Sequence, residues 1–164
     1  MTMKTHNTIV VGGGQAGLAA SEHLSNQGVD HLVLERDRIA EKWRTARWDN
    51  LVANGPAWHD RFPTMKINGV GDDGFASKDQ MAVYFEEFAE QISAPIKCGV
   101  TVNAVSRLDE GGFLLETSEG AMMAENVIAA TGPFQIPVFP KIIPEDSGVR
   151  QIHSCYYRNP QSLD

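Results

Sequence analysis

The chain has 164 residues, of which 42% are hydrophobic and 21% are charged, and its formal net charge at pH 7 is −7. A chain of this size can bury a hydrophobic core, and these fractions are typical of a globular domain, which argues against disordered and fibrous proteins. The acidic balance and the lack of a long basic stretch argue against a nucleic-acid surface and a patch for anionic membranes. We therefore expect neither a nucleic-acid nor a membrane partner.

The two cysteines, Cys98 and Cys155, are far apart and form no C-x-x-C motif. They predict free thiols in a reducing cytoplasm, with no disulfide framework and no metal site. No apolar run is long enough for a membrane-spanning helix. The small-residue stretch Thr8–Ala20 resembles a secretory signal, but three consecutive glycines would disrupt its helix.

The N-terminal residues predict one strand–helix–strand unit. A β-branched run at Asn7–Val11 indicates a buried strand, and glycines follow it directly. Residues Ala16–Leu24 have helical character, and Gly28 is a typical residue to end that helix. His31–Leu34 predicts a second buried strand, which completes a βαβ unit.

The middle of the chain predicts a long irregular segment and one helix. Residues Asp37–Gly74 are rich in loop-forming residues, whereas Ser77–Ile92 predicts a helix with Ser77 as its N-cap. Pro95 follows the helix. The apolar face of this helix is expected to comprise Met81, Val83, Tyr84, Phe85 and Phe88.

Three short strands are predicted next, joined by glycine-containing hairpin turns, at Val100–Leu108, Gly112–Thr117 and Ala121–Glu125. A separate buried strand is expected at Asn126–Ala130. Prolines beyond it argue against regular structure, and a further extended piece is expected around Val149–His153. The elements together predict an α/β fold with a parallel sheet and a small three-stranded antiparallel excursion.

A G-x-G-x-x-G motif lies between the first strand and the first helix. Gly12 would allow a tight turn, Gly14 would let a diphosphate approach the backbone, and Gly17 would let helix and strand pack closely. The helix N-terminus would then face the diphosphate. Glu35, at the end of the second strand, could accept hydrogen bonds from an adenosine ribose, which favours FAD or NAD over NADP. The alternative is a glycine-rich turn followed by a surface glutamate.

The antiparallel excursion favours a flavoprotein, because a plain NAD dehydrogenase would continue with another helix and parallel strand. At this point the chain resembles the flavin-containing monooxygenase family, above all its bacterial members and the plant indole-pyruvate monooxygenases. The resemblance rests on the segments Ile9–Leu18, Leu34–Arg36, Trp43–Arg44, Arg47–Leu51, Ala129–Gly132 and His153–Arg158. There are two departures. No Phe precedes His153 and Gly148 is one residue too far from it, and Glu41 and Lys42 stand where the family often has glycines.

The resemblance implies a Rossmann-like FAD-binding domain and a set of cofactor-binding residues. These are Gly12, Gly13, Gly14, Gln15, Ala16, Gly17, Glu35, Lys42, Trp43, Arg44, Val102, Thr131 and Gly132. Trp43 could instead be a simple core aromatic. Asn54 aligns with the family asparagine near the flavin and is the expected catalytic residue, although an asparagine before a glycine is also common in turns. His153 is expected to have a structural role.

The implied function is that of an FAD-dependent oxidoreductase of the monooxygenase type, which oxidises a small organic substrate with NAD(P)H and O2. The missing C-x-x-C argues against the related dithiol reductases. Residues 1–164 would form the N-terminal portion of the FAD-binding domain. A second glycine fingerprint for NADP is absent, so its domain is expected to lie outside this chain.

Three hypotheses remain open for this chain. It could be one part of an enzyme that needs a C-terminal partner chain, an FAD-binding module with no turnover on its own, or a non-binding remnant. Without the family's returning strand, we expect an open sheet edge, an exposed apolar patch and self-association.

Overall fold

The computed structural model describes residues 5–134, 136–144 and 146–163. The chain divides into two compact units, one made of residues 1–40 and 83–132, the other of residues 41–82 and 133–164. The division falls within the longest helix. Each unit is described by itself.

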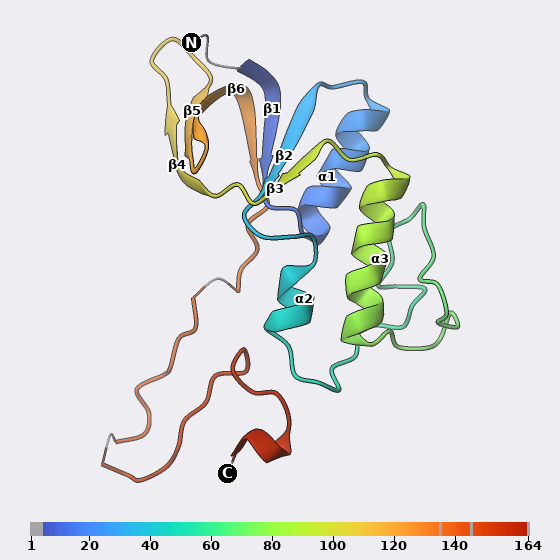
Figure 1. The fold of residues 1–164 in the computed structure, drawn as a ribbon, viewed down its shortest axis with the longest axis vertical. Coiled ribbons are helices and arrows are strands. Elements are labelled where there is room, and N and C mark those ends of the chain that lie inside the picture. The colour runs from blue at the N-terminus through green and yellow to red at the C-terminus, as the bar shows by residue number, and fades with distance from the viewer. Residues whose placement is uncertain (1–4, 135, 145, 164) are drawn as a thin grey trace. The chain divides into compact units, whose positions relative to one another are not determined.

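The first unit is built on one six-stranded sheet with the strand order β3-β2-β1-β6-β5-β4 (Figure 1). The first four strands in that order pair in parallel, whereas β4, β5 and the start of β6 pair antiparallel. The bounds are β1 (Thr5–Val11), β2 (His31–Glu35), β3 (Ile96–Cys98), β4 (Val102–Arg107), β5 (Phe113–Thr117) and β6 (Gly120–Ala129). The expected α/β class and the antiparallel excursion are confirmed.

Strand β6 differs from the prediction of two strands, because Ala121–Glu125 and Asn126–Ala130 belong to one continuous ten-residue strand. Its first half pairs with β5 as far as Ala124, and from Met123 onward it pairs with β1. The excursion and the parallel sheet are therefore one surface. In the described part of the chain, no strand pairs with β6 beyond Ala124 on the side away from β1; we call this stretch the outer edge of β6. This half of β6 is only partly buried, whereas we expected a buried strand.

Strand β3 was not predicted. It is three residues long and two of them are exposed, so it lacks the apolar run by which a strand is recognised in sequence. Its position comes instead from pairing with β2, with Val33 opposite Ile96 and Glu35 opposite Cys98. This edge strand brings Cys98 next to the acidic residue at the end of β2.

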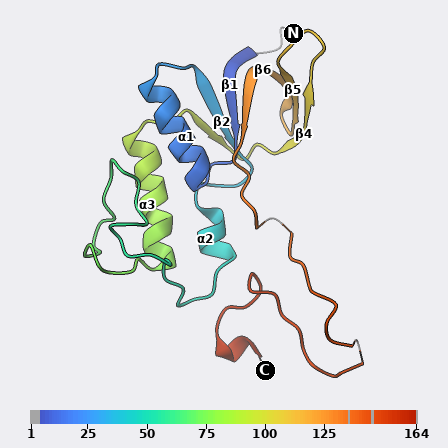
Figure 2. The same cartoon turned by 180° about the vertical axis from the view of Figure 1, so that it is seen from behind.

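Helix α1 (Gln15–Asn26) lies beside β1 and β2 in both views of the ribbon (Figures 1 and 2). Leu18 and Ser21 are fully buried on its inner side. Gly28 has a φ of 67°, in the left-handed region, and ends the helix as predicted. A core cluster of Ile9, Leu34, Val100, Leu115 and Ala124 connects the strands of the sheet.

The second unit contains a short helix, α2 (Glu41–Thr45), which was missed within the segment expected to be loop. It also contains the start of α3 (Lys78–Gln91) and a terminal 3-10 turn, η1 (Pro160–Leu163). The N-terminus of α3 is closed by a capping box, in which the Gln80 N–H donates to Ser77 Oγ and the Ser77 N–H donates to Gln80 Oε1. Ser77 is thus the N-cap that the sequence predicted.

The apolar face of α3 is narrower than predicted. Met81, Tyr84, Phe85 and Phe88 are buried, whereas Val83 is 46% exposed. The four buried positions follow the i, i+3, i+4, i+7 spacing of one helix face, and Val83 falls outside it.

Residues 133, 134 and 136–144 form no helix or strand, as their prolines predicted, and residues 149–153 are also irregular. Within the described residues, no helix is both long and apolar enough to cross a membrane.

Candidate functional site

The glycine turn after β1 is held tightly against two neighbouring strands. Gly12 has a φ of 110°, and its N–H donates to the Leu34 carbonyl over 2.8 Å. A Cβ atom at Gly12 would lie 2.4 Å from the carbonyl oxygen of Ala130, directly after β6. Glycine is therefore required here both by the backbone conformation and by the close approach of β6.

The other two motif glycines have opposite surroundings. A Cβ atom at Gly17 would lie 1.8 Å from the Gly12 carbonyl oxygen, so the turn packs directly on α1. Gly14, by contrast, has open space where its Cβ would stand. Gly14, Gln15 and Ala16 are exposed, and no side chain caps α1, whose first turn also has no acidic residue. The free N–H groups of this helix start can therefore face an anion such as a diphosphate.

Glu35 is connected to this turn by its carboxylate. Oxygen Oε2 accepts a hydrogen bond from the Gly13 N–H at 2.7 Å, and Oε1 accepts one from the Asp37 N–H at 2.9 Å. A carboxylate has further lone pairs, so these bonds leave room for hydroxyl donors. From the sequence, Glu35 was predicted only as an acceptor for a ribose. Its second role, holding the glycine turn through the Gly13 N–H, was not predicted.

Cys98, on β3, lies opposite Glu35 of the neighbouring strand β2. Burial, and secondarily the negative charge of Glu35, raise the pKa of the Cys98 thiol, against a lowering contribution from a hydrogen bond with the Ile39 backbone. A raised pKa keeps the thiol protonated at neutral pH and makes it a poor nucleophile. Both cysteines are free thiols, as predicted.

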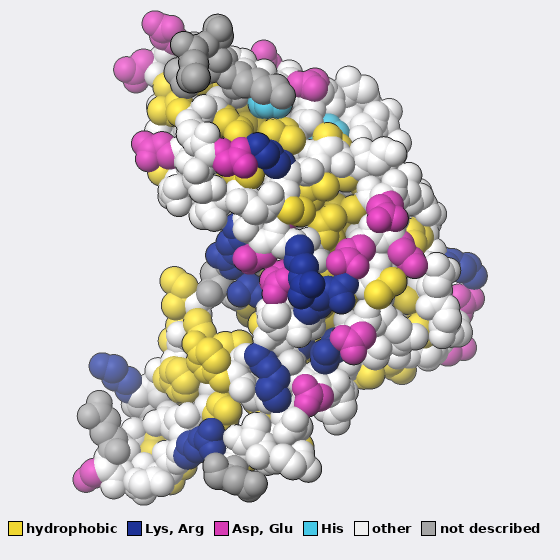
Figure 3. Space-filling view, in the orientation of Figure 1, with side chains coloured by type: hydrophobic (Ala, Val, Ile, Leu, Met, Phe, Trp, Pro, Cys, Tyr) yellow, Lys and Arg dark blue, Asp and Glu magenta, His cyan; other side chains and the backbone are white. Residues whose placement is uncertain are grey.

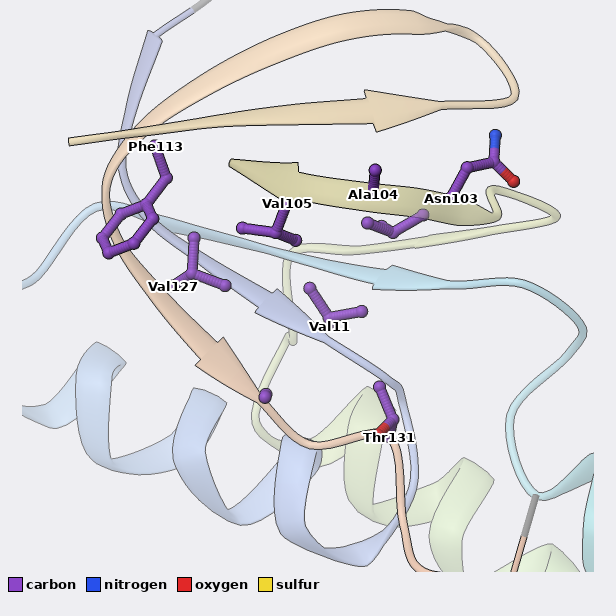
Figure 4. Close-up of a pocket in the computed structure, with 9 residues that line it drawn as sticks. Val11, Asn103, Ala104, Val105, Phe113, Val127 and Thr131 are labelled. Atoms are coloured by element: carbon purple, nitrogen blue, oxygen red, sulfur yellow. The ribbon is translucent and has the colours of Figure 1, made fainter. Parts of the chain in front are cut away.

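Val102 and Thr131, two predicted cofactor residues distant in sequence, line the same cavity of about 360 Å³ (Figure 4). Figure 4 shows Val11 and Val127 pointing from the parallel strands toward β4, with Phe113 and Thr131 at different ends of the cavity. The lining is mostly apolar: Val11, Val102, Asn103, Ala104, Val105, Phe113, Val127, Ala129 and Thr131. Gly132, the next residue, has a φ of 76°, which favours glycine.

The remaining predicted cofactor residues, Lys42, Trp43 and Arg44, lie on α2 in the second unit. Ala40, just before α2, has a φ of 60°. The left-handed position that suits glycine is therefore Ala40, whereas Glu41 and Lys42, where the sequence comparison looked for glycines, are helical.

Trp43 is half-buried against an arginine one turn later. The Arg47 guanidinium lies 5.3 Å from the Trp43 ring centre and 6.0 Å from that of Phe134. Both distances are within the range of a cation–π contact. Arg47 lies beyond the end of α2 at Thr45, so this contact does not follow from helical spacing and could not be predicted from the sequence.

Arg158 fixes the segment that follows α2. Its guanidinium donates to the carbonyls of Thr45, Arg47 and Cys155, and its own carbonyl accepts the Asp49 N–H at 2.8 Å. The Asn159 amide donates to the Asp49 carboxylate at 2.6 Å. The sequence offered no signal for the contacts with Thr45, Arg47 and Asp49, because these residues are more than a hundred positions away from Arg158 and Asn159.

Asn54, the predicted catalytic residue, lies in a bend of the second unit and is exposed. The Gly55 N–H donates to Asp60 Oδ2 at 2.7 Å, and the Ala53 N–H donates to the Ala76 carbonyl at 2.7 Å. The backbone is thus fixed on both sides of Asn54. Among the described residues, no three His, Cys, Asp or Glu side chains are grouped to hold a metal ion.

Comparison with known proteins places this geometry in a family. The family model described as pyridine nucleotide-disulphide oxidoreductase matches residues 9–164. An uncharacterized oxidoreductase, CzcO-like, from Geobacillus kaustophilus is 35% identical over 159 residues, which cover 96% of this chain and 45% of that protein. A probable indole-3-pyruvate monooxygenase, YUCCA1, from Arabidopsis thaliana is 30% identical over 163 residues, covering 96% of this chain and 39% of that protein.

A solved flavin monooxygenase from Stenotrophomonas maltophilia has the same fold, with a TM-score of 0.86 and 24% identity over 98% of this chain and 48% of that one. The chain thus spans about half the length of the relatives it matches, and the resemblance to flavin monooxygenases is confirmed. A solved steroid monooxygenase, similar in fold with a TM-score of 0.70 and 20% identity, is bound to NADP. Since the family model covers nearly the whole sequence, the chain belongs to the pyridine nucleotide-disulphide oxidoreductase family.

Proposed function

We propose that this chain supplies the FAD-binding part of a flavin monooxygenase-type oxidoreductase that oxidises a small organic substrate with NAD(P)H and O2. The observation that carries the proposal is the glycine turn itself. It places an uncapped helix N-terminus and the open space at Gly14 in the same turn whose Gly13 is bonded to the Glu35 carboxylate. Relatives named as monooxygenases support this reaction.

The residues present fit FAD. The exposed start of α1 offers N–H donors to the diphosphate, and Glu35 offers acceptors to the ribose. Val102 would meet the adenine through its backbone, and Thr131 and Gly132 would close over the cofactor. When bound, FAD supplies the redox chemistry. Lys42 and Trp43 would contact the cofactor, with Arg44 adjacent to them, and the Trp43 ring would exclude water from the flavin side.

Asn54 would contribute a carboxamide that can both donate and accept hydrogen bonds at the reacting edge. The free thiols support a cytoplasmic location, which we include in the proposal. The second candidate function is an FAD-binding module that has no turnover by itself.

FAD titration tests the proposal directly. We expect the purified chain to bind one FAD, with the visible flavin spectrum of a protein-bound cofactor and a change in flavin fluorescence. A Gly71→Ala variant should bind equally well, because Gly71 lies in a loop of the second unit with open space around its Cβ position. A wild-type chain that stays colourless in excess FAD would contradict both candidate functions and favour a non-binding remnant.

We also propose that the chain associates, either with a C-terminal partner chain or with itself. The outer edge of β6 from Glu125 to Ala129 is available for pairing, as defined above. Figure 3 shows hydrophobic side chains at the surface of the chain. In the second unit, Ile136 is 82% exposed and Ile142 is 80% exposed. Unpaired strand edges and exposed apolar side chains both favour association.

Light scattering over a range of protein concentrations tests self-association. We expect the mass to rise above that of one chain as concentration increases. The double variant Ile136→Asp, Ile142→Asp should reduce this rise, because it replaces exposed apolar surface with charge. A monodisperse monomer at every concentration would rule out self-association and leave the partner chain as the remaining proposal.

A further inference from the structure

The bend at Asn54 and Gly55 is not the turn that this residue pair usually forms. Asparagine followed by glycine favours a type I′ turn, in which both central residues have positive φ. Neither Asn54 nor Gly55 is among the described residues with positive φ. The glycine at position 55 must therefore have another physical reason.

That reason is the side chain of Asp60. A Cβ atom at Gly55 would lie 2.4 Å from Asp60 Oδ1 and 2.8 Å from His59 Nδ1. The missing side chain lets the carboxylate reach the backbone, where Oδ2 accepts the Gly55 N–H at 2.7 Å. Glycine is thus required for the approach of Asp60 and not for the backbone conformation.

Asp60 is itself held in place from several directions. Its N–H donates to the Pro56 carbonyl at 3.0 Å, as does the N–H of His59 at 2.8 Å. Its Oδ1 lies 2.7 Å from His59 Nδ1, and its side chain is only 24% exposed. A half-buried carboxylate with two partners is a fixed acceptor and not a mobile surface charge.

The Asn54 side chain does not make the hydrogen bond to the turn backbone that an asparagine often makes. Asparagine side chains commonly bond the backbone two residues further on and so form the turn themselves. Two residues beyond Asn54 stands Pro56, which has no N–H to donate, and the Gly55 N–H donates to Asp60. Within the described part of the chain, the exposed carboxamide of Asn54 makes no hydrogen bond. The turn therefore does not need the Asn54 side chain, and its donors and acceptor are available to a bound molecule.

We infer that Asp60 is the positioning residue for Asn54: it fixes the backbone on the far side of Asn54 and leaves the carboxamide available to a bound cofactor or substrate. The inference rests on the proposed function, in which Asn54 acts at the reacting edge. It assigns to Asp60 a role that neither the motif nor the comparisons gave it.

Amide hydrogen exchange measured by NMR on the full chain tests the positioning step without any cofactor. In Asp60→Ala we expect the Gly55 amide to exchange at least about tenfold faster, since its acceptor is gone. The Ala57 amide, which donates to the Gly74 carbonyl, should keep its rate and so reports that the segment remains folded. Asp60→Asn should retain most of the Gly55 protection, because its amide oxygen still accepts this hydrogen bond.

Asp72→Asn is the matched control, since Asp72 is an exposed carboxylate in a long surface ion pair with Lys66. It should leave Gly55 exchange unchanged. Unchanged Gly55 exchange in Asp60→Ala would overturn the inference. Loss of protection in Asp60→Asn as large as in Asp60→Ala would also overturn it, and this variant decides the matter if the alanine variant does not fold.

The side-chain NH2 resonances of Asn54 give the readout that a merely structural role would not move. We expect FAD to shift them in wild type and in Asp60→Asn, but not in Asp60→Ala. If FAD binds to the wild type without shifting them, the proposed role of Asn54 fails and Asp60 has no carboxamide to position. A shift that persists in Asp60→Ala overturns the inference while the proposed function stands.

Discussion

Gly17→Ala is expected to destabilise the chain by about 3 kcal/mol or more, because the new methyl group would stand 1.8 Å from the Gly12 carbonyl oxygen. The obstructing atom belongs to the backbone, so no rotamer change can relieve the clash. Either α1 must move away from the turn or the turn must distort. Urea denaturation, followed by circular dichroism, would measure the loss as a lower midpoint with a similar slope.

The variant Gly14→Ala is the matched counterpart in the same motif. Its methyl group would meet nothing within 4 Å, and Gly14 has an extended conformation with a φ of −84°. We expect a cost below about 1 kcal/mol, since alanine is a poorer N-cap than glycine. FAD affinity should nevertheless fall strongly, because the methyl group occupies the space through which a diphosphate would approach.

Gly17→Ala and Gly14→Ala, three positions apart, therefore test the stability of the fold and the binding of FAD separately. Equal unfolding midpoints for wild type and Gly17→Ala would mean that the turn does not pack on α1 as described. Unchanged FAD affinity in Gly14→Ala, with Gly71→Ala as the reference, would show that the open space at Gly14 is not the diphosphate site.

Glu35→Ala is expected to weaken both the fold and the binding of FAD. The substitution removes the acceptor of the Gly13 and Asp37 N–H groups, of which the Gly13 group is part-buried. Leaving a buried donor unpaired costs about 1–3 kcal/mol. Loss of the ribose acceptor should lower FAD affinity by a further 2–3 kcal/mol or about 30- to 150-fold.

Glu35→Gln should have an intermediate effect on stability, because its amide oxygen can still accept one of the two bonds. Glu119→Gln, which removes an exposed ion pair with Lys97, should change stability by less than about 1 kcal/mol. Isothermal titration with FAD and urea denaturation would measure the two effects separately. Wild-type FAD affinity in Glu35→Ala would exclude this carboxylate as the ribose acceptor.

The sequence predicted those parts of the fold that depend on local patterns. The glycine turn and the Ser77 cap are each defined by residues within a few positions of one another, and the first βαβ unit by three consecutive elements between Thr5 and Glu35. Glu35 was found because the end of the second strand is a fixed distance from the glycine turn. The class of fold and the family resemblance followed from these features.

What could not be predicted depends on contacts between distant segments. β3 is recognised only by its pairing with β2, and the continuity of β6 only by its two different partners. Asp60 and Arg158 have ordinary neighbours in sequence, and their roles arise from hydrogen bonds that form after folding. The exposure of Val83 follows from one helix face being buried, which an apolar side chain alone does not reveal.

The continuous strand β6 also determines the order in which this sheet can be completed. β1 pairs on one side with β2, about twenty residues away, but on the other side with residues 123–129 of β6. The β5–β6 hairpin is local and can form early, whereas the β1–β6 pairing must close a loop of more than a hundred residues. During synthesis on the ribosome, β1 would therefore remain half-paired until residues 123–129 have been made. The β5–β6 hairpin contains the last strands of the sheet in the sequence, but it can form as soon as both strands have been made. It then acts as the template on which β1 completes the sheet.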